Sequence, residues 1–152
     1  MEALAVIAAA QPRRHRMPGP RDRLLSEGRT CYDHFAGRLG VAIADALNAA
    51  EGIIERGGHF DITPEGERRL AMLDVDVAAL RLDTRPLCRC CIDWSERRPH
   101  LAGAVGASLT ANALRTGWVH RLGDTRGVRV TPAARAVFRD AIGLYLDLPI
   151  AA

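Results

Sequence analysis

Apolar residues recur at helical spacing in the first third of the chain. Between residues 24 and 50 the side chains of Leu39, Ile43 and Leu47 follow one another at intervals of one helical turn. Such a spacing places them on one face of a helix. We therefore expect helix over most of this stretch, with a break at Gly40 that separates two packed helices.

Shorter apolar runs follow, and glycines separate them. Residues 53–54 and 60–62 are apolar at their ends and flank the pair Gly57-Gly58, which predicts a small β-hairpin. Residues 63–64 are Thr-Pro, a strong signal for the start of a helix. The threonine hydroxyl can cap the first turn, and proline suits the first helical position.

The second half of the chain returns to the same succession of patterns. We expect a helix over 87–97, a bent helical stretch from 99 to 117 and a hairpin over 118–130. Residues 131–132 are again Thr-Pro and predict a final helix to about Leu146. Each half thus predicts helices, then a hairpin, then a helix.

The two halves also align as strings of residues. FAGRLGVAIADAL (35–47) matches LAGAVGASLTANAL (101–114), and ITPEG (62–66) matches VTPAA (130–134). The gaps of this alignment fall in predicted turns, where insertions are tolerated. We interpret the pattern as an internal repeat of one architectural unit.

Small residues recur at matching places in the repeat. Ala36 and Gly40 correspond to Ala102 and Gly106, and they would let two helices pack closely, as in a winged-helix unit. The sequence therefore predicts a mainly α fold with small β-hairpin wings, built from two tandem winged-helix-like units. The expected divisions are a remnant helix of a preceding domain, a Pro- and Arg-rich linker and the two units, at residues 1–10, 11–23, 24–82 and 83–148.

Composition and charge narrow the cellular setting. The net charge is only +3, and no stretch approaches the roughly 20 apolar residues of a membrane span. Glu2 precedes the first apolar run and arginines follow it, the reverse of a secretory signal. We expect a cytoplasmic protein without membrane contact, whose four cysteines are free thiols.

Two groups of thiol, carboxylate and imidazole side chains are the candidate chemistry. They are Cys31, Asp33 and His34 in the first half, and Cys91, Asp93 and His100 in the second. These are the ligand types that hold zinc or a softer divalent metal. The alternative is structural: free cysteines pack as small apolar groups, and Asp93 pairs with Arg97 four positions along a helix.

Catalytic motifs are lacking in the sequence. It has no nucleophile elbow, no phosphate-binding loop, no zinc-protease motif and no dinucleotide-binding turn. We therefore expect a protein that is not an enzyme and that carries no cofactor beyond a possible divalent metal.

Three segments resemble a known family. RTCYDHFAGRLGVAIADAL (29–47), CCIDWSERRPHLAGAVGASL (90–109) and VRVTPAARAVF (128–138) are similar to the C-terminal region of bacterial ArsR-type winged-helix transcriptional regulators. The resemblance covers about residues 24–146. It implies the regulatory or dimerising portion of a transcription regulator, acting as a homodimer. The alternative function is a module that senses a metal or small ligand through the Cys/His/Asp groups.

The same resemblance bears on DNA binding. It implies that an N-terminal winged helix binds operator DNA, and that this domain is largely missing here, with residues 2–9 similar to its last helix. Within the chain, the second half offers the better candidates for DNA contact, because polar helix residues can read base edges and hairpin arginines can grip phosphates. These candidates are Ser108, Thr110, Asn112, Arg115, Arg121, Arg126 and Arg129. The alternative is a solvated hairpin without such a role.

Overall fold

The structure is a computed structural model that describes residues 19–147. In chain order its elements are α2 (Pro20–Glu27), β1 (Arg29–Cys31), β2 (His34–Ala36), α3 (Gly37–Ala49), β3 (Ile53–Glu55), β4 (Phe60–Ile62), α4 (Pro64–Ala71), α5 (Val77–Leu80), β5 (Arg89–Ile92), β6 (Pro99–Ala102), α6 (Gly103–Arg115), β7 (Val119–Arg121), β8 (Val128–Val130) and α7 (Pro132–Ile142). The predicted remnant helix over 1–10 lies outside the described residues. Residues 20–23, at the end of the predicted linker, belong to α2.

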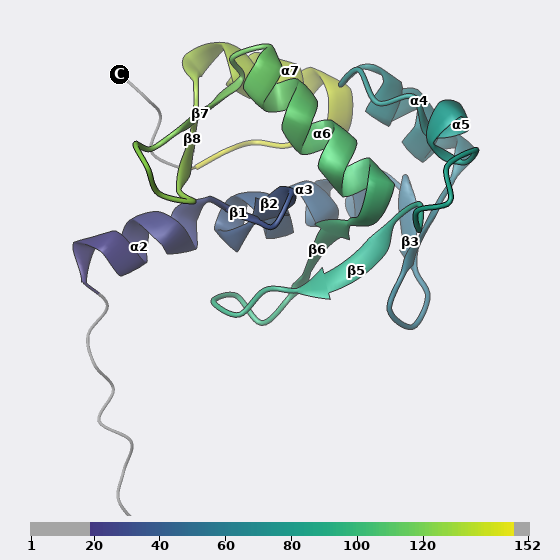
Figure 1. Cartoon of the computed structure of the whole chain (residues 1–152). Coiled ribbons are helices and arrows are strands. Elements are labelled where there is room, and N and C mark those ends of the chain that lie inside the picture. The colour runs from purple at the N-terminus through teal and green to yellow at the C-terminus, as the bar shows by residue number, and fades with distance from the viewer. Residues whose placement is uncertain (1–18, 148–152) are drawn as a thin grey trace, which may run out of the picture.

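A hairpin, a helix, a second hairpin and another helix succeed one another, and this order occurs twice after α2 (Figure 1). Every hairpin is a separate antiparallel sheet of two strands. Helices make up 44% and strands 22% of the structure, so the fold is mixed α/β. The prediction of a mainly α fold was therefore wrong, and tandem winged-helix-like units are not confirmed.

The error in the first half concerns the residues before α3. The stretch from 24 to 50 is not two packed helices, because β1 and β2 form a hairpin between α2 and α3. Gly37 opens α3 in the left-handed region, with a φ of 71°, so no helix continues through it. The spacing of apolar residues does not predict these strands, because β1 buries the polar Arg29 and Thr30.

The second half contains the same error. The expected helix over 87–97 is instead β5 and a turn, and the chain from Pro99 to Ala102 is β6 rather than helix. Gly103 opens α6 with a φ of 74°, as Gly37 does for α3. In both halves a left-handed glycine marks the change from strand to helix, a conformation that glycine adopts readily.

Gly40 and Gly106 have another role than the one expected of them. They do not form a turn between helices but lie within α3 and α6. A Cβ at Gly40 would lie 2.5 Å from the carbonyl oxygen of Phe35, and one at Gly106 would lie 2.4 Å from that of Leu101. The glycines therefore let each helix fold back tightly against the strand that precedes it.

The later elements of each half follow the sequence. The β3–β4 and β7–β8 hairpins form where they were expected, and α4 and α7 begin at Pro64 and Pro132. The Thr63 hydroxyl caps α4 by accepting the N–H of Gly66 at 3.0 Å. The Thr131 hydroxyl does not cap α7 and instead donates to the carbonyl oxygen of Trp118 at 3.1 Å.

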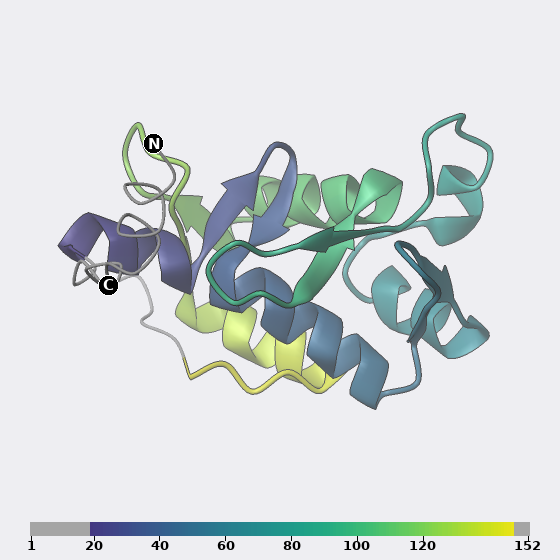
Figure 2. The same cartoon turned by 90° about the horizontal axis from the view of Figure 1, so that it is seen from below.

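The two halves share one hydrophobic core. Strand β6 packs against α3 and β2 against α6, while β2 and β6 lie side by side, as Figure 2 shows from below. The N–H of Thr30 in β1 donates to the carbonyl oxygen of Arg126 at the β7–β8 hairpin, and the N–H of Cys90 in β5 donates to that of Gly58 at the β3–β4 hairpin. A backbone hydrogen bond thus joins one strand of each half to a hairpin of the other half. Over residues 19–147, no helix combines the length and apolar character needed to cross a membrane.

Candidate metal centre

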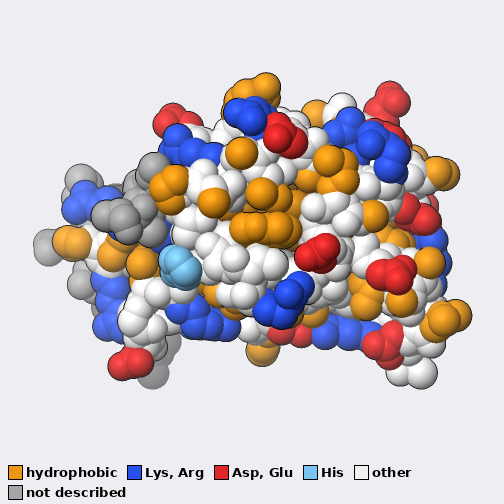
Figure 3. Space-filling view, turned by 90° about the horizontal axis from the view of Figure 1, so that it is seen from above, with side chains coloured by type: hydrophobic (Ala, Val, Ile, Leu, Met, Phe, Trp, Pro, Cys, Tyr) orange, Lys and Arg blue, Asp and Glu red, His pale blue; other side chains and the backbone are white. Residues whose placement is uncertain are grey.

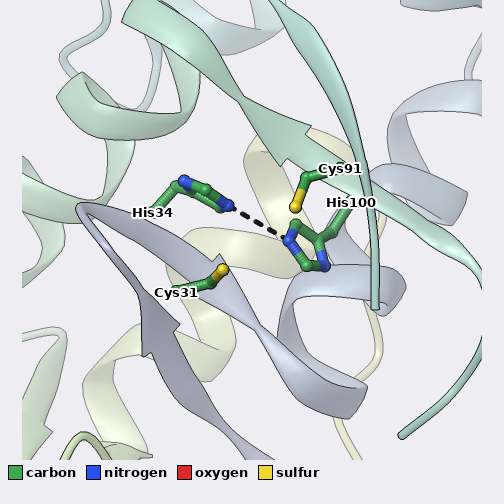
Figure 4. A group of neighbouring side chains, drawn as sticks. All are labelled: Cys31, His34, Cys91 and His100. Atoms are coloured by element: carbon green, nitrogen blue, oxygen red, sulfur yellow. Dashed lines mark hydrogen bonds between the residues drawn. The ribbon is translucent and has the colours of Figure 1, made fainter. Parts of the chain in front are cut away.

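Four side chains from two hairpins converge at one place (Figure 4). Cys31 lies directly opposite His34 in the β1–β2 hairpin, and Cys91 lies opposite His100 in the β5–β6 hairpin. Opposite residues project on the same face of a hairpin, so each hairpin presents one thiol and one imidazole. The four potential ligand atoms all lie within 4.8 Å of one another. We call these four residues the Cys/His cluster.

The two histidines of the cluster are in direct contact. The Nε2 atoms of His34 and His100 are 3.1 Å apart in a buried hydrogen bond. Burial lowers the pKa of His34, and burial together with the neighbouring His34 lowers the pKa of His100 to about 4. Both imidazoles are therefore neutral at pH 7, which is the form that binds metals.

A carboxylate stands behind each imidazole. Asp33 Oδ1 lies 3.4 Å from His34 Nδ1, and Asp93 Oδ2 lies 3.5 Å from His100 Nδ1. The Asp33 carboxylate favours a proton on Nδ1 of His34, whereas Nδ1 of His100 has no hydrogen-bond partner among the described residues. With both rings neutral, the hydrogen between the two Nε2 atoms then belongs to His100. Both histidines thus present the same ring nitrogen to the space between the thiols.

Asp93 is the more firmly held of the two carboxylates. It is buried, forms an ion pair with Arg29 at 2.7 Å, and accepts the N–H of Gly37 at 2.7 Å and the hydroxyl of Ser95 at 2.6 Å. Burial opposes its ionisation, but hydrogen bonds from Ser95 and from backbone N–H groups outweigh burial and lower the pKa of Asp93. The expected pairing of Asp93 with Arg97 is wrong, since Asp93 pairs with Arg29 from the other half.

The Cys91 thiol of the cluster resists ionisation. Burial and the neighbouring Cys31 raise the pKa of Cys91 to about 11. A metal ion bound in the cluster would displace these thiol protons, because thiolate is the form that coordinates metals. Any metal binding at the cluster would therefore depend on pH.

The sequence proposed two separate groups of candidate ligands, and the structure brings both together. Their cysteines and histidines form the cluster, and the aspartates Asp33 and Asp93 stand behind it. Sequence reasoning missed Arg29. A signal for it exists: the pattern Arg-x-Cys-x-Asp occurs at 29–33 and again at 89–93.

The candidate DNA-contacting residues of α6 lie largely within the fold. Thr110 is buried, Ser108 is half-buried, and the Asn112 amide donates to the carbonyl oxygen of Asp74 at 2.6 Å. Arg115 lies 3.6 Å from the carboxylate of Asp74. The helix therefore directs most of its polar side chains towards other parts of the chain.

The candidates of the β7–β8 hairpin are more accessible. Arg121 and Arg126 are exposed, and Arg129 is half-buried. On the face in Figure 3, basic side chains alternate with acidic ones around a central hydrophobic patch. That face shows no continuous basic surface among the described residues.

Comparison with known proteins gives one informative match. No family model matches the chain, and no solved structure matches it. Over 119 residues the chain is 38% identical to YdfF, an uncharacterized HTH-type transcriptional regulator of Bacillus subtilis (strain 168). The match includes 78% of this chain and 52% of the relative, so the chain spans about half the length of the curated relative it matches. The chain is therefore homologous to about half of a transcriptional regulator.

Proposed function

We propose that this chain is the regulatory portion of a transcriptional regulator and that it responds to a divalent metal ion held by the Cys/His cluster. The observation that carries the proposal is the convergence of Cys31, His34, Cys91 and His100 within 4.8 Å. The homology to an HTH-type transcriptional regulator supports the regulatory role. A metal bound here would be the signal to which the regulator responds.

The donor set fits a thiophilic divalent ion such as Zn²⁺. Two thiolates and two neutral imidazoles carry two negative charges, so a divalent cation leaves the buried centre neutral. Zn–S and Zn–N bonds of about 2.3 and 2.0 Å place tetrahedral ligand atoms about 3.3 to 3.8 Å apart. The four ligand atoms already lie within 4.8 Å, and the two imidazole nitrogens lie within 3.1 Å. Small side-chain movements would therefore complete a tetrahedral site.

The surroundings of the cluster also suit a metal. Once Nε2 of each histidine coordinates the ion, Nδ1 carries a proton that needs an acceptor. Asp33 supplies that acceptor to His34 at 3.4 Å, and Asp93 Oδ2 lies 3.5 Å from Nδ1 of His100, which has no hydrogen-bond partner among the described residues.

The homology to YdfF also bears on DNA binding. The name of the relative specifies a helix–turn–helix, and we propose that operator binding belongs to the part of such a regulator that this chain does not match. Membership of the ArsR type, a homodimer and a cytoplasmic location belong to the same proposal. Any contact that this chain itself makes with DNA would come from Arg121, Arg126 and Arg129 on the β7–β8 hairpin, where the accessible candidates lie.

Cobalt titration tests the metal site. The reduced, chelator-treated protein is expected to bind one equivalent of Co²⁺ and to develop the visible absorption of a tetrahedral cobalt–thiolate centre. Cys91→Ser and His34→Gln should abolish that spectrum. Cys90→Ser is the matched control, because it removes the adjacent thiol, which is not part of the cluster. An unchanged spectrum in Cys91→Ser, or loss of the spectrum in Cys90→Ser, would contradict the assignment.

A further inference from the structure

A cavity of about 620 Å³ opens beside the Cys/His cluster. His34 and Cys91 line its inner end, and Tyr32, Ile92 and Arg89 line the part near the surface. Tyr32 and Ile92 are exposed, with 95% and 62% of their surfaces accessible. The volume of the cavity lies within the range of about 300 to 1,000 Å³ that is typical of small-molecule sites.

The cavity exists because the β1–β2 and β5–β6 hairpins, which we call the inner hairpins, have connections of different length. Only residues 32–33 connect β1 to β2, whereas residues 93–98 connect β5 to β6. The longer connection folds back over Arg29, which is 1% exposed. The shorter connection cannot reach the corresponding place in the other half, and that place is the cavity.

Residues of the long connection between β5 and β6 bind Arg29 of β1. The Asp93 carboxylate pairs with the guanidinium at 2.7 Å, the Ser95 hydroxyl lies 3.2 Å from it, and the Trp94 ring covers it at 4.4 Å. A carboxylate and an aromatic ring together therefore satisfy a buried arginine. Such a combination joins a charge-assisted hydrogen bond to a cation–π contact.

Arg89, the counterpart of Arg29 beside the cavity, lacks such partners. Arg89 holds the same position as Arg29 in the Arg-x-Cys-x-Asp pattern, and its side chain lines the cavity. The counterpart of Asp93 is Asp33, which pairs with Arg85 at 2.7 Å instead. Within residues 19–147, no carboxylate forms an ion pair with Arg89. Gly103, the counterpart of the Gly37 whose N–H donates to Asp93, also lines the cavity.

We propose that the cavity binds a small aromatic carboxylate. Its carboxylate would pair with Arg89 as Asp93 pairs with Arg29, and its ring would extend away from the guanidinium along the cavity wall. The exposed side chains of Tyr32 and Ile92 supply apolar surface for the ring. The site goes beyond the proposed metal response, because the regulator would then take a second, organic signal next to the metal.

Benzoate is the probe, and amide chemical shifts of the reduced, chelator-treated protein are the readout. Titration with benzoate should shift the amide signals of Arg89, Ile92 and Gly103 saturably. Benzamide, which has the same shape without the charge, should bind at least about tenfold more weakly. Arg89→Gln should weaken benzoate binding by a similar factor, whereas Arg23→Gln, an exposed arginine on α2, should leave it unchanged. Dispersed spectra of both variants show that each is folded.

Equal binding of benzoate and benzamide, or unchanged benzoate binding by Arg89→Gln, would overturn the proposal. Cobalt titrations keep this result separate from the metal proposal. Arg89→Gln should keep the cobalt spectrum, because Arg89 is not part of the cluster. Cys31→Ser should lose the cobalt spectrum and keep benzoate binding, because Cys31 does not line the cavity. Failure of the cavity and failure of the metal site therefore give different results.

Discussion

The carboxylate of Asp93 contacts residues of both halves. Its carboxylate lies 3.5 Å from His100 in its own half, and it pairs with Arg29 and with the N–H of Gly37 from the other. An isolated buried carboxylate would be costly, and these partners remove most of that cost. One aspartate thus supports a candidate metal ligand and the packing of the first hairpin.

The pH dependence of stability follows from His100. Its pKa in the folded protein is about 4, below the ordinary value of 6.5, because burial disfavours the charged ring. The unfolded chain therefore takes up a proton first as the pH falls, so the contribution of His100 to stability is complete above pH 6.5 and is lost towards pH 4. We expect the metal-free protein to lose on the order of 3 kcal/mol of unfolding free energy from this group. Urea unfolding at several pH values in the presence of a chelator measures the loss.

Two substitutions test this assignment. His100→Gln should flatten the dependence of unfolding free energy on pH between 6.5 and 4. His120→Gln removes an exposed imidazole and should leave the slope as it is. A slope that is the same in His100→Gln and in the unsubstituted protein would show that other groups cause the acid sensitivity.

At the scale of elements, each inner hairpin is pressed against the helix that follows it. Gly40 in α3 and Gly106 in α6 face the backbones of β2 and β6, and an added Cβ would lie 2.5 or 2.4 Å from a carbonyl oxygen. Backbone atoms cannot move aside as a flexible side chain can. The strand–helix corner therefore requires glycine at both places.

Gly40→Ala should destabilise the protein although alanine is the better helix former. Helix propensity alone favours the substitution by up to about 1 kcal/mol. The contact with the Phe35 carbonyl opposes it, and overpacking of this kind costs about 1–3 kcal/mol or more. The midpoint of urea denaturation should therefore fall.

Gly57→Ala is the comparison for this prediction. Gly57 lies at the β3–β4 turn, where an added Cβ meets no atom within 4 Å, so only its left-handed backbone resists substitution. The expected cost is about 1 kcal/mol. If Gly40→Ala proved as stable as the unsubstituted protein, the close packing of β2 on α3 would be wrong.

At the scale of the whole molecule, the Cys/His cluster lies where the two halves meet. Cys31 and His34 come from the first half, and Cys91 and His100 come from the second. Neither half holds more than two of the four ligands. A bound metal would therefore link two hairpins that are about sixty residues apart in the sequence, as the numbering of the cysteines shows.

Zinc should consequently stabilise the folded chain as a whole. A ligand that binds only the folded state at 100 times its Kd adds about 2.7 kcal/mol to the unfolding free energy. We expect urea unfolding of the reduced protein to show a gain of this size when free Zn²⁺ is buffered at that ratio. Cys31→Ser should show little gain, and Cys90→Ser should show the full gain. Equal stabilisation of Cys31→Ser would place the metal elsewhere.

The sequence by itself determined the local features. The β3–β4 and β7–β8 hairpins and the starts of α4 and α7 depend on glycine, threonine and proline signals that act over a few residues. The candidate ligand types were also evident, because thiols and imidazoles near carboxylates are a chemical fact of the sequence. The division into units at 82 and 83 and the DNA-contacting residues stay predictions.

Only the tertiary structure decided which of these residues meet. The inner hairpins bury Arg29, Thr30 and His34, and a pattern of apolar positions carries no information on polar residues that are satisfied by distant partners. The sequence also did not predict that the two ligand groups form one cluster. They meet because β2 packs against α6 and β6 packs against α3. Contacts between segments so far apart depend on the fit of whole surfaces, which no local window of sequence contains.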